Sequence, residues 1–285
     1  LSLDLISKVV LKTDLLDYID LRSGFTSGTV AINLVDAALP VSALSCGFTP
    51  DGQVTYTQVN VTIDSLQSKT TMCVEDLRSV YQSAFMNAGT GNDFIPFENV
   101  ISESYSDKLR KYNEGFLING SAGGAMTGLK GQITAANGAN LQGGAIAAWT
   151  AANAFEQALD LYDAIDESVK DRDDLIMVVS PDAYRALVRA LVAQNLYHFN
   201  SVESNDILIL PGTNVTVVKS SGLVGSDNKF AGPGKMILAA TGLTDELDNF
   251  RFFYDEAADV MKFRAAWRLG VGVGEVNVFA TNDMA

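Results

Sequence analysis

The segment between residues 54 and 63 restricts the possible folds of this chain more than any other feature. Its side chains alternate between the two faces of an extended strand, with Val54, Tyr56, Gln58, Asn60 and Thr62 on one face and Thr55, Thr57, Val59, Val61 and Ile63 on the other. The turn signal Thr49-Pro50-Asp51-Gly52 precedes it, because Pro presets φ and Gly accepts positive φ. We expect a β-hairpin over about residues 41–73. Such a polar hairpin has too little core to stand alone, so a neighbouring surface must cover it.

The clearest helix is expected over residues 97–118. Pro96 suits a first helical turn, and Asn119-Gly120 is typical of a helix end. Apolar residues recur at steps of three and four, at Phe97, Ile101, Tyr105, Leu109, Tyr112 and Phe116. A helix of this length spans about 33 Å at ~1.5 Å per residue, which is long for a globular protein.

The remaining chain alternates between helices and strands, so we expect an α+β fold. Residues 120–148 are rich in Gly, Ala and Asn and are expected to form a linker or a mobile loop. Further elements are expected as a short strand at Thr29–Val35, a helix at 150–169, a buried strand at Leu175–Val179, a helix after Ser180-Pro181, and C-terminal strands. In the strand 259–269, one face carries Met261, Phe263, Ala265, Trp267 and Leu269, and the other carries Lys262, Arg264 and Arg268.

Composition excludes several classes of protein. The chain has 285 residues, and 47% of them are hydrophobic, which excludes a disordered chain. It has 20 Lys and Arg against 34 Asp and Glu, a net charge of −14 that disfavours generic binding of nucleic acid. No apolar run is long enough to span a membrane. Two Cys and one His exclude a zinc site of the usual four-ligand kind.

The residues that could carry catalysis form no complete motif. Gly270, Gly272 and Gly274 are flanked by strands, whereas a dinucleotide loop needs a following helix. His198 is the only histidine, and the acidic run at 163–174 lacks the pattern of a calcium loop. We therefore assign no catalytic residue, cofactor or metal, and expect a structural or binding protein. An acidic α+β enzyme stays an alternative, which would require convergent carboxylates of raised pKa in a pocket.

Taken in order, these elements resemble the major capsid proteins of tailed bacteriophages, which have the Hong Kong 97 fold. The features that carry the resemblance are the extended start, the hairpin at 41–73, the long helix opened by Phe97-Glu98-Asn99-Val100-Ile101 and closed by Asn119-Gly120, the Gly-rich connector, Leu175–Val179 with Ser180-Pro181, Leu210-Pro211-Gly212, and the closing strands 259–279. The resemblance covers nearly the whole chain. It implies a Hong Kong 97-like capsid fold with an N-terminal arm (1–40), an extended hairpin loop (41–73), a peripheral domain with a spine helix (74–144), an axial domain (145–240) and return strands of the peripheral domain (241–285).

The resemblance also implies a function. Copies of the chain would form hexamers and pentamers that close an icosahedral shell around double-stranded DNA, without sequence-specific DNA contacts and without a membrane. Portal and decoration proteins would be further partners, and the protein would reside in the virion after assembly in the host cytoplasm. Leu1 in place of Met fits removal of a scaffolding segment by a maturation protease. An encapsulin-type nanocompartment shares the fold and stays an alternative.

The interface between subunits is expected on the hairpin and on the spine helix. On the hairpin loop we place Gln58, Asn60 and Lys69, and Lys69 could also form an isopeptide cross-link. On the spine helix we place Tyr105, Leu109 and Tyr112. For these three, packing inside the subunit is the competing interpretation.

Overall fold

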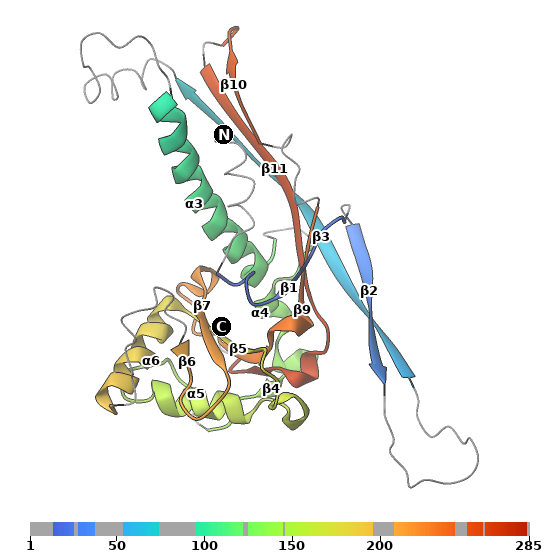
Figure 1. The fold of residues 1–285 in the computed structure, drawn as a ribbon, viewed down its shortest axis with the longest axis vertical. Helices are drawn as coiled ribbons and strands as arrows, with labels where there is room; N and C mark the ends of the chain where they lie inside the picture. Colours follow the sequence, from blue (N-terminus) through green and yellow to red (C-terminus); the bar gives the residue numbers. More distant parts are fainter. Residues whose placement is uncertain are drawn as a thin grey trace.

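The computed structural model describes residues 14–25, 28–37, 54–73, 95–121, 125–144, 146–195, 208–242, 250–258 and 260–283. In these ranges the chain forms two six-stranded sheets (Figure 1). The long sheet, in the order β1-β9-β11-β3-β2 with β10 paired to β11, contains β1 (Asp20–Arg22), β2 (Gly28–Ala37), β3 (Val54–Cys73), β9 (Ile237–Thr241), β10 (Phe250–Asp255) and β11 (Val260–Val273). The compact sheet, in the order β4-β12-β8-β5-β7-β6, contains β4 (Asn140–Leu141), β5 (Leu175–Val179), β6 (Leu208–Ile209), β7 (Thr216–Lys219), β8 (Phe230–Pro233) and β12 (Ala280–Thr281).

Strand β3 runs through most of the long sheet and changes its partner on the way. Its 20 residues span about 66 Å at ~3.3 Å per residue. Residues 54–63 pair with β2, and residues 62–73 pair with β11 on the opposite edge of β3. The hairpin arms are therefore Gly28–Ala37 and Val54–Ile63, and the expected range 41–73 is wrong at both ends, because β11 is the partner of the second half. Residues 38–53 lie outside the described ranges.

The buried face of β3 also switches at the point where the partner changes. Val59, Val61 and Ile63 are buried in a small apolar cluster with Leu238 and Ala240. From residue 64 onward the even-numbered side chains are half-buried and the odd-numbered ones are exposed. Since side chains alternate along a strand, a different layer of the protein covers each half.

The long helix α3 (Ile95–Asn119) covers the second half of this sheet (Figure 1). The helix confirms the prediction within two residues. Phe263, Ala265, Trp267 and Leu269 on β11 are buried, as their alternation predicts. Gly120 ends the helix at a φ of +83°, and a Cβ there would lie 2.6 Å from the Met126 carbonyl oxygen. A glycine is therefore required at this close turn.

The described part of the Gly-rich connector packs into the core, so the expectation of a linker or mobile loop is wrong for this part. It contains α4 (Leu129–Gln132) and η1 (Ala135–Asn137). Leu129 and Ile133 are completely buried. The Gln132 amide donates to the Val271 carbonyl oxygen at 3.1 Å and accepts from the Val273 backbone N–H at 3.1 Å. The connector thereby joins α3 to β11.

Two helices accompany the compact sheet. Strand β5 is completely buried, as predicted, and α6 (Pro181–Ala193) begins at Ser180, whose Oγ accepts from the Ala183 backbone N–H at 3.2 Å. Helix α5 covers only Ala154–Asp163, which is shorter than the expected 150–169. The Asp166 carboxylate accepts from the Ser168 backbone N–H at 2.9 Å and starts the separate turn η2 (Glu167–Val169).

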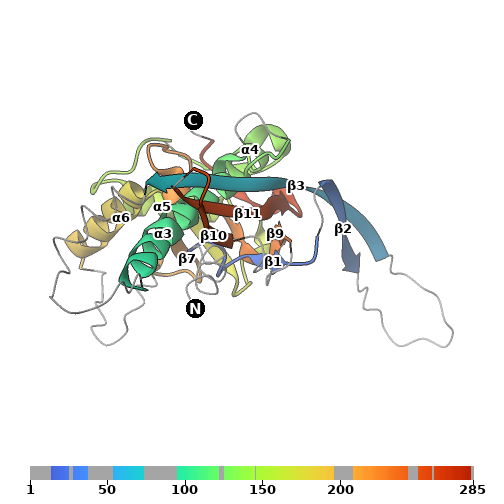
Figure 2. The ribbon, with the colours of Figure 1, turned by 90° about the horizontal axis from the view of Figure 1, so that it is seen from above.

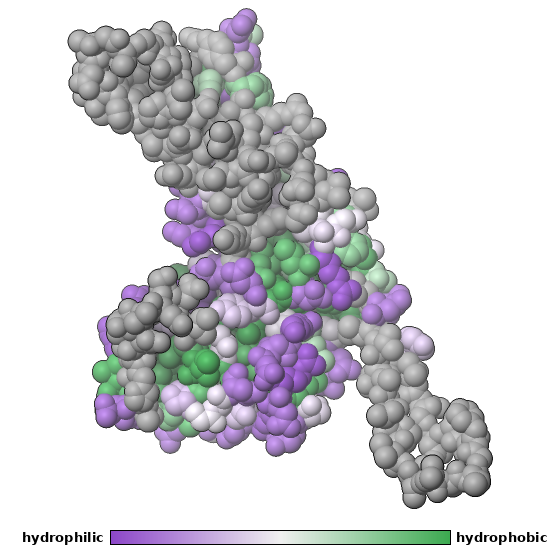
Figure 3. All heavy atoms as spheres, in the orientation of Figure 1, coloured by the Kyte–Doolittle hydropathy of each residue, from purple (hydrophilic) through white to green (hydrophobic). Residues whose placement is uncertain are grey.

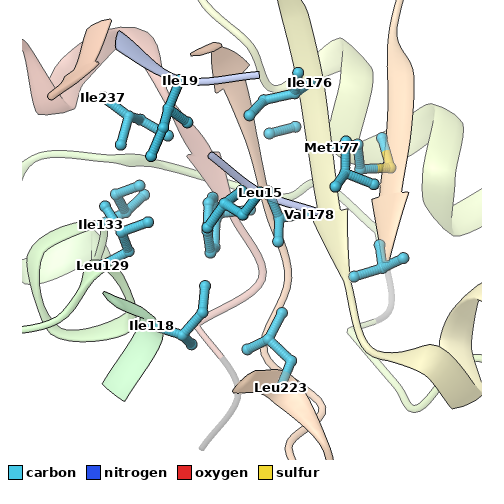
Figure 4. Close-up of a cluster of buried hydrophobic side chains, with 14 of the residues drawn as sticks. Leu15, Ile19, Ile118, Leu129, Ile133, Ile176, Met177, Val178, Leu223 and Ile237 are labelled. Atoms are coloured by element: carbon cyan, nitrogen blue, oxygen red, sulfur yellow. The ribbon is translucent and has the colours of Figure 1, made fainter. Parts of the chain in front are cut away.

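One continuous core connects the two sheets. Figure 4 shows its centre, where Leu15 and Ile19 from the N-terminal segment lie in one cluster with Ile118 from α3, Ile133 after α4, and Val178 from β5. Each of these side chains is at most 7% exposed. The spine helix and the two sheets therefore pack as a single body.

A buried lysine lies directly before β8 of the compact sheet. Lys229 has no exposed surface, and its Nζ donates to the Asp227 carbonyl oxygen at 2.6 Å and lies 5.3 Å from the centre of the Trp149 ring. Burial lowers the pKa of Lys229 to about 8, while the Asp227 carboxylate opposes this shift. Asn282 holds the C-terminal segment here, since its amide accepts from the Lys229 backbone N–H at 2.7 Å and donates to the Asp227 carbonyl oxygen at 2.7 Å.

Candidate assembly surfaces

Strand β2 and the first half of β3 form a two-stranded ribbon that projects from the body (Figures 1 and 2). Tyr56 is 74% exposed on this ribbon. The predicted residues Gln58 and Asn60 are exposed on the same face, and the Gln58 amide donates to Asn33 Oδ1 at 3.5 Å. A two-stranded ribbon in water is marginally stable at best. The exposed face is therefore suited to contact with another molecule.

Among the side chains that the structure describes on the ribbon, the buried ones lie at its base. Val61 and Ile63 are at most 2% exposed, and Val59 is 9% exposed, in the cluster that β9 completes. Each fully buried Val or Ile stabilises the attachment by about 1.5–3 kcal/mol. Farther out, the described side chains Tyr56 and Gln58 are exposed. Apolar burial within the subunit thus fixes where the ribbon starts and offers the described outer part little support.

The structure separates Lys69 from the other two predicted hairpin residues. Lys69 lies on the second half of β3, directly opposite Arg264 of β11. Its side chain is exposed, but it stands on the sheet of the body and not on the ribbon. The prediction that Lys69 belongs to the loop is wrong, because the hairpin ends at Ile63.

The three predicted residues of the spine helix have different environments. Tyr105 stacks on Phe263, with ring centroids 4.6 Å apart, and Leu109 is 6% exposed. These two side chains pack within the subunit, as the competing interpretation has it. Tyr112 is 55% exposed and meets Trp267 edge-on at 6.5 Å. An interface role for Tyr112 stays a prediction.

A polar joint between α3 and the compact sheet was not anticipated. The Asn119 amide donates to the Gly222 carbonyl oxygen at 2.9 Å, and Ser221 Oγ donates to Glu114 Oε2 at 2.6 Å. A Cβ on Gly222 would lie 2.8 Å from the Glu114 carbonyl oxygen. Only a residue without a side chain allows this approach. The contact joins residues 107 apart in the chain, and no local sequence signal indicates it.

The resolved shifts in carboxyl pKa belong to structural contacts. Hydrogen bonding to Arg172 lowers the pKa of Asp174, and hydrogen bonding to Lys262 lowers the pKa of Asp255. The Ser168 hydroxyl lowers the pKa of Asp166, which caps η2. In the described part of the chain no three His, Cys, Asp or Glu residues gather as metal ligands would. His198 lies outside the described ranges. None of the helices described there is both long and apolar enough to span a membrane.

This chain matches known proteins in its structure but not in its sequence. No family model and no curated protein matches the sequence. The procapsid of satellite phage P4 matches with a TM-score of 0.61 and 9% identity, over 98% of this chain and 88% of that chain. The capsid of the native GTA particle matches with a TM-score of 0.59 and 13% identity, over 96% and 89%. A virus-like particle from Pyrococcus furiosus matches with a TM-score of 0.55 and 11% identity, over 98% and 97%.

At these identities the likeness establishes the fold. The chain has the α+β capsid fold of these particles over almost its entire length. The expectation of a Hong Kong 97-like fold is therefore confirmed for the α+β fold as a whole.

Proposed function

We propose that this chain is the major capsid protein of a tailed bacteriophage. Its copies assemble as hexamers and pentamers into an icosahedral shell that encloses double-stranded DNA. The observation that carries the proposal is the projecting β2–β3 ribbon, which is anchored at its base, while Tyr56 and Gln58 farther out are exposed. A subunit of a shell provides the neighbouring surface that such a ribbon requires. The likeness to capsids over 96–98% of the chain supports the same function.

In this proposal each part of the fold has a role. Helix α3 is the spine of a peripheral domain that includes β3, β9, β10 and β11, and the compact sheet with α5 and α6 forms the axial domain. The expected axial range 145–240 is therefore corrected, because β9 (Ile237–Thr241) belongs to the long sheet and β4 and β12 belong to the compact one. The extended loop begins at Gly28 and not at residue 41, so the N-terminal arm is correspondingly shorter than 1–40. Tyr56, Gln58, Asn60 and Tyr112 are the proposed contacts between subunits. Portal and decoration proteins are further partners, and the shell is assembled in the host cytoplasm and becomes part of the virion.

A second candidate is a nanocompartment that encloses cargo in place of a genome. The match to the Pyrococcus furiosus virus-like particle favours it, because the two chains cover 98% and 97% of each other. Both candidates are shells of this one chain and differ in their contents.

Negative-stain electron microscopy of the expressed protein, combined with its mass in solution, tests the proposal. We expect closed polyhedral shells or rings of five and six subunits. A stable monomer or dimer at all concentrations would overturn both shell functions. Particles isolated from the native source would then be digested externally with nuclease and assayed for protected DNA. Protected DNA of genome length supports the phage capsid, and a protein cargo without DNA supports the nanocompartment.

A further inference from the structure

The long sheet has one face that α3 does not cover. On this open face, β3 contributes Ser65, Gln67, Lys69, Thr71 and Cys73, which are all exposed. Their partners on β11 are Arg268, Ala266, Arg264, Lys262 and Val260. The register with β10 adds Phe253 opposite Lys262 and Asp255 opposite Val260. Among the side chains that the structure describes, the face therefore carries four basic residues, at positions 69, 262, 264 and 268, and one acidic residue, in a chain whose net charge is −14.

The central row of this face places like charges opposite one another. Lys69 and Arg264 occupy paired positions on two adjacent strands. Like charges directly opposite in a sheet are destabilising. Lys262 has Asp255 as an ion-pair partner, but among the described residues no carboxylate forms an ion pair with Lys69 or Arg264. A row of this kind is stabilised by an anionic surface from outside the sheet.

The same chain carries an acidic surface on the compact half. Residues 156–174, from α5 to the start of β5, contain eight acidic residues and two basic ones. Lys170 pairs with Glu167 at 2.7 Å and Arg172 pairs with Asp174 at 2.8 Å. Because both basic residues of the segment are already in ion pairs, acidic residues remain in excess on this surface. Asp163, Asp171 and Asp173 are exposed there.

These two charged surfaces lie at opposite ends of the molecule. In Figure 1, β10 and the adjoining part of β11 lie toward the upper end, and α5 lies at the lower end of the body. Hydrophilic residues lie beside hydrophobic ones on that lower end in Figure 3. The two surfaces are thus too far apart to meet within one subunit. A contact between unlike patches of two copies is heterologous, and such contacts close into rings when the rotation allows.

We propose that the open basic face around Lys69 and Arg264 docks the acidic segment 156–174 of a second copy of this chain. The inference rests on the proposed function, because a shell is what brings many copies into contact. A second copy is favoured over nucleic acid as the partner, since the net charge of −14 repels a polyanion over a long range. The charge pattern would also orient each subunit relative to its neighbour.

Reciprocal charge reversal in the full-length chain tests this inference. One variant carries Lys69→Glu and Arg264→Glu, a second carries Asp163→Lys, Asp171→Lys and Asp173→Lys, and a third combines all five changes. The matched control is Arg189→Glu with Lys235→Glu, which reverses two exposed basic residues on the compact half. Sedimentation measures the assembled fraction, and circular dichroism confirms that every variant is folded.

We expect each of the first two variants to lose at least about tenfold in assembled fraction, because each creates like-charge contacts. An equimolar mixture of these two should assemble better than either alone. The five-change variant should recover its assembled fraction, and the control should assemble as the wild type does.

Normal shells from the Lys69→Glu/Arg264→Glu variant, or no recovery in the five-change variant, would overturn the docking and leave the shell function intact. Normal shells that no longer retain DNA would overturn it in favour of nucleic acid. A wild-type chain that forms no assembly would instead overturn the proposed function itself.

Discussion

The compact sheet and the β2–β3 ribbon represent two ways of building β-structure from one chain. In the compact sheet, β5 lies between β7 and β8, and all five of its residues are buried. In the ribbon, the buried side chains that the structure describes lie at the base, and Tyr56 is 74% exposed. The compact half takes its stability from its own core, whereas a two-stranded ribbon is only marginally stable in water by itself. The same contrast is repeated within β3, whose two halves bury opposite faces.

The largest effect is expected where the compact half depends on its core. Leu161 of α5 has no exposed surface. Leu161→Ala should lower the free energy of unfolding by about 2–5 kcal/mol, because it removes buried methyl groups and leaves a cavity. Chemical denaturation measures this change. The matched control is Val192→Ala on α6, which is 58% exposed and should change stability by less than about 0.5 kcal/mol. Equal losses in the two variants would contradict the contrast.

The buried ammonium of Lys229 is expected to weaken the compact half at neutral pH. Its pKa is about 8 in the folded chain, against 10.5 for a free lysine. Between these two values the unfolded chain retains the proton that the folded chain releases, so stability rises with pH. At ~1.4 kcal/mol per pKa unit, this one group contributes a rise of up to about 3 kcal/mol.

Denaturation of the wild type and of Lys229→Met at several pH values checks this expectation. The difference between the two proteins isolates Lys229 from the other titrating groups. We expect the variant to be the more stable one at pH 7 and to lose its advantage between pH 8 and 10.5. The control is Lys235→Met, at an exposed lysine, which should show no such dependence on pH. A constant difference across this range would show that Lys229 is not buried as an ammonium.

A smaller effect is expected at the joint between α3 and the compact half. Gly222→Ala would place a Cβ 2.8 Å from the Glu114 carbonyl oxygen and 2.9 Å from Ile118 Cβ. Neither atom belongs to the end of a flexible side chain, so the helix would have to shift. We expect a loss of about 1–3 kcal/mol in unfolding free energy, typical of overpacking. Gly143→Ala is the control, since no atom lies within 4 Å of its Cβ position. Similar stability of the two variants would indicate that the joint is loose.

Local patterns were sufficient to predict the elements that local rules determine. The steps of three and four predicted α3, the apolar run predicted β5, and Ser180-Pro181 predicted the start of α6. The alternation along β11 identified its buried face. Each of these signals depends on residues a few positions apart.

Pairing between distant segments could not be predicted from the same patterns. The alternation of β3 is compatible with any partner strand, so it does not determine where the hairpin ends. The registers with β2 and β11 determine these ends. The glycines of the connector suggested a loop, but Leu129 and Ile133 pack it into the core. For the candidate site, Gln58 and Asn60 are exposed, as their positions on the polar face of the strand predict. Tyr105 and Tyr112 belong to the same apolar stripe of the helix, but they differ in exposure. The difference comes from Phe263 and Trp267, which lie about 155 residues away in sequence.

The smallest effect on the subunit and the most informative one is expected at Tyr56. Tyr56→Ala removes a ring that is 74% exposed, so the free energy of unfolding of the isolated subunit should change by less than about 0.5 kcal/mol. If a neighbouring copy covers the ribbon, the same ring is buried on assembly, and aromatic residues often dominate such interfaces. The assembled fraction at a fixed protein concentration should then fall at least about tenfold, as measured by sedimentation. Val224→Ala, at another exposed apolar residue of 66% exposure, provides the comparison for a general loss of surface hydrophobicity. A variant that unfolds and assembles as the wild type does would mean that this part of the ribbon needs no neighbour, and the contrast between the two regions would lose its functional meaning.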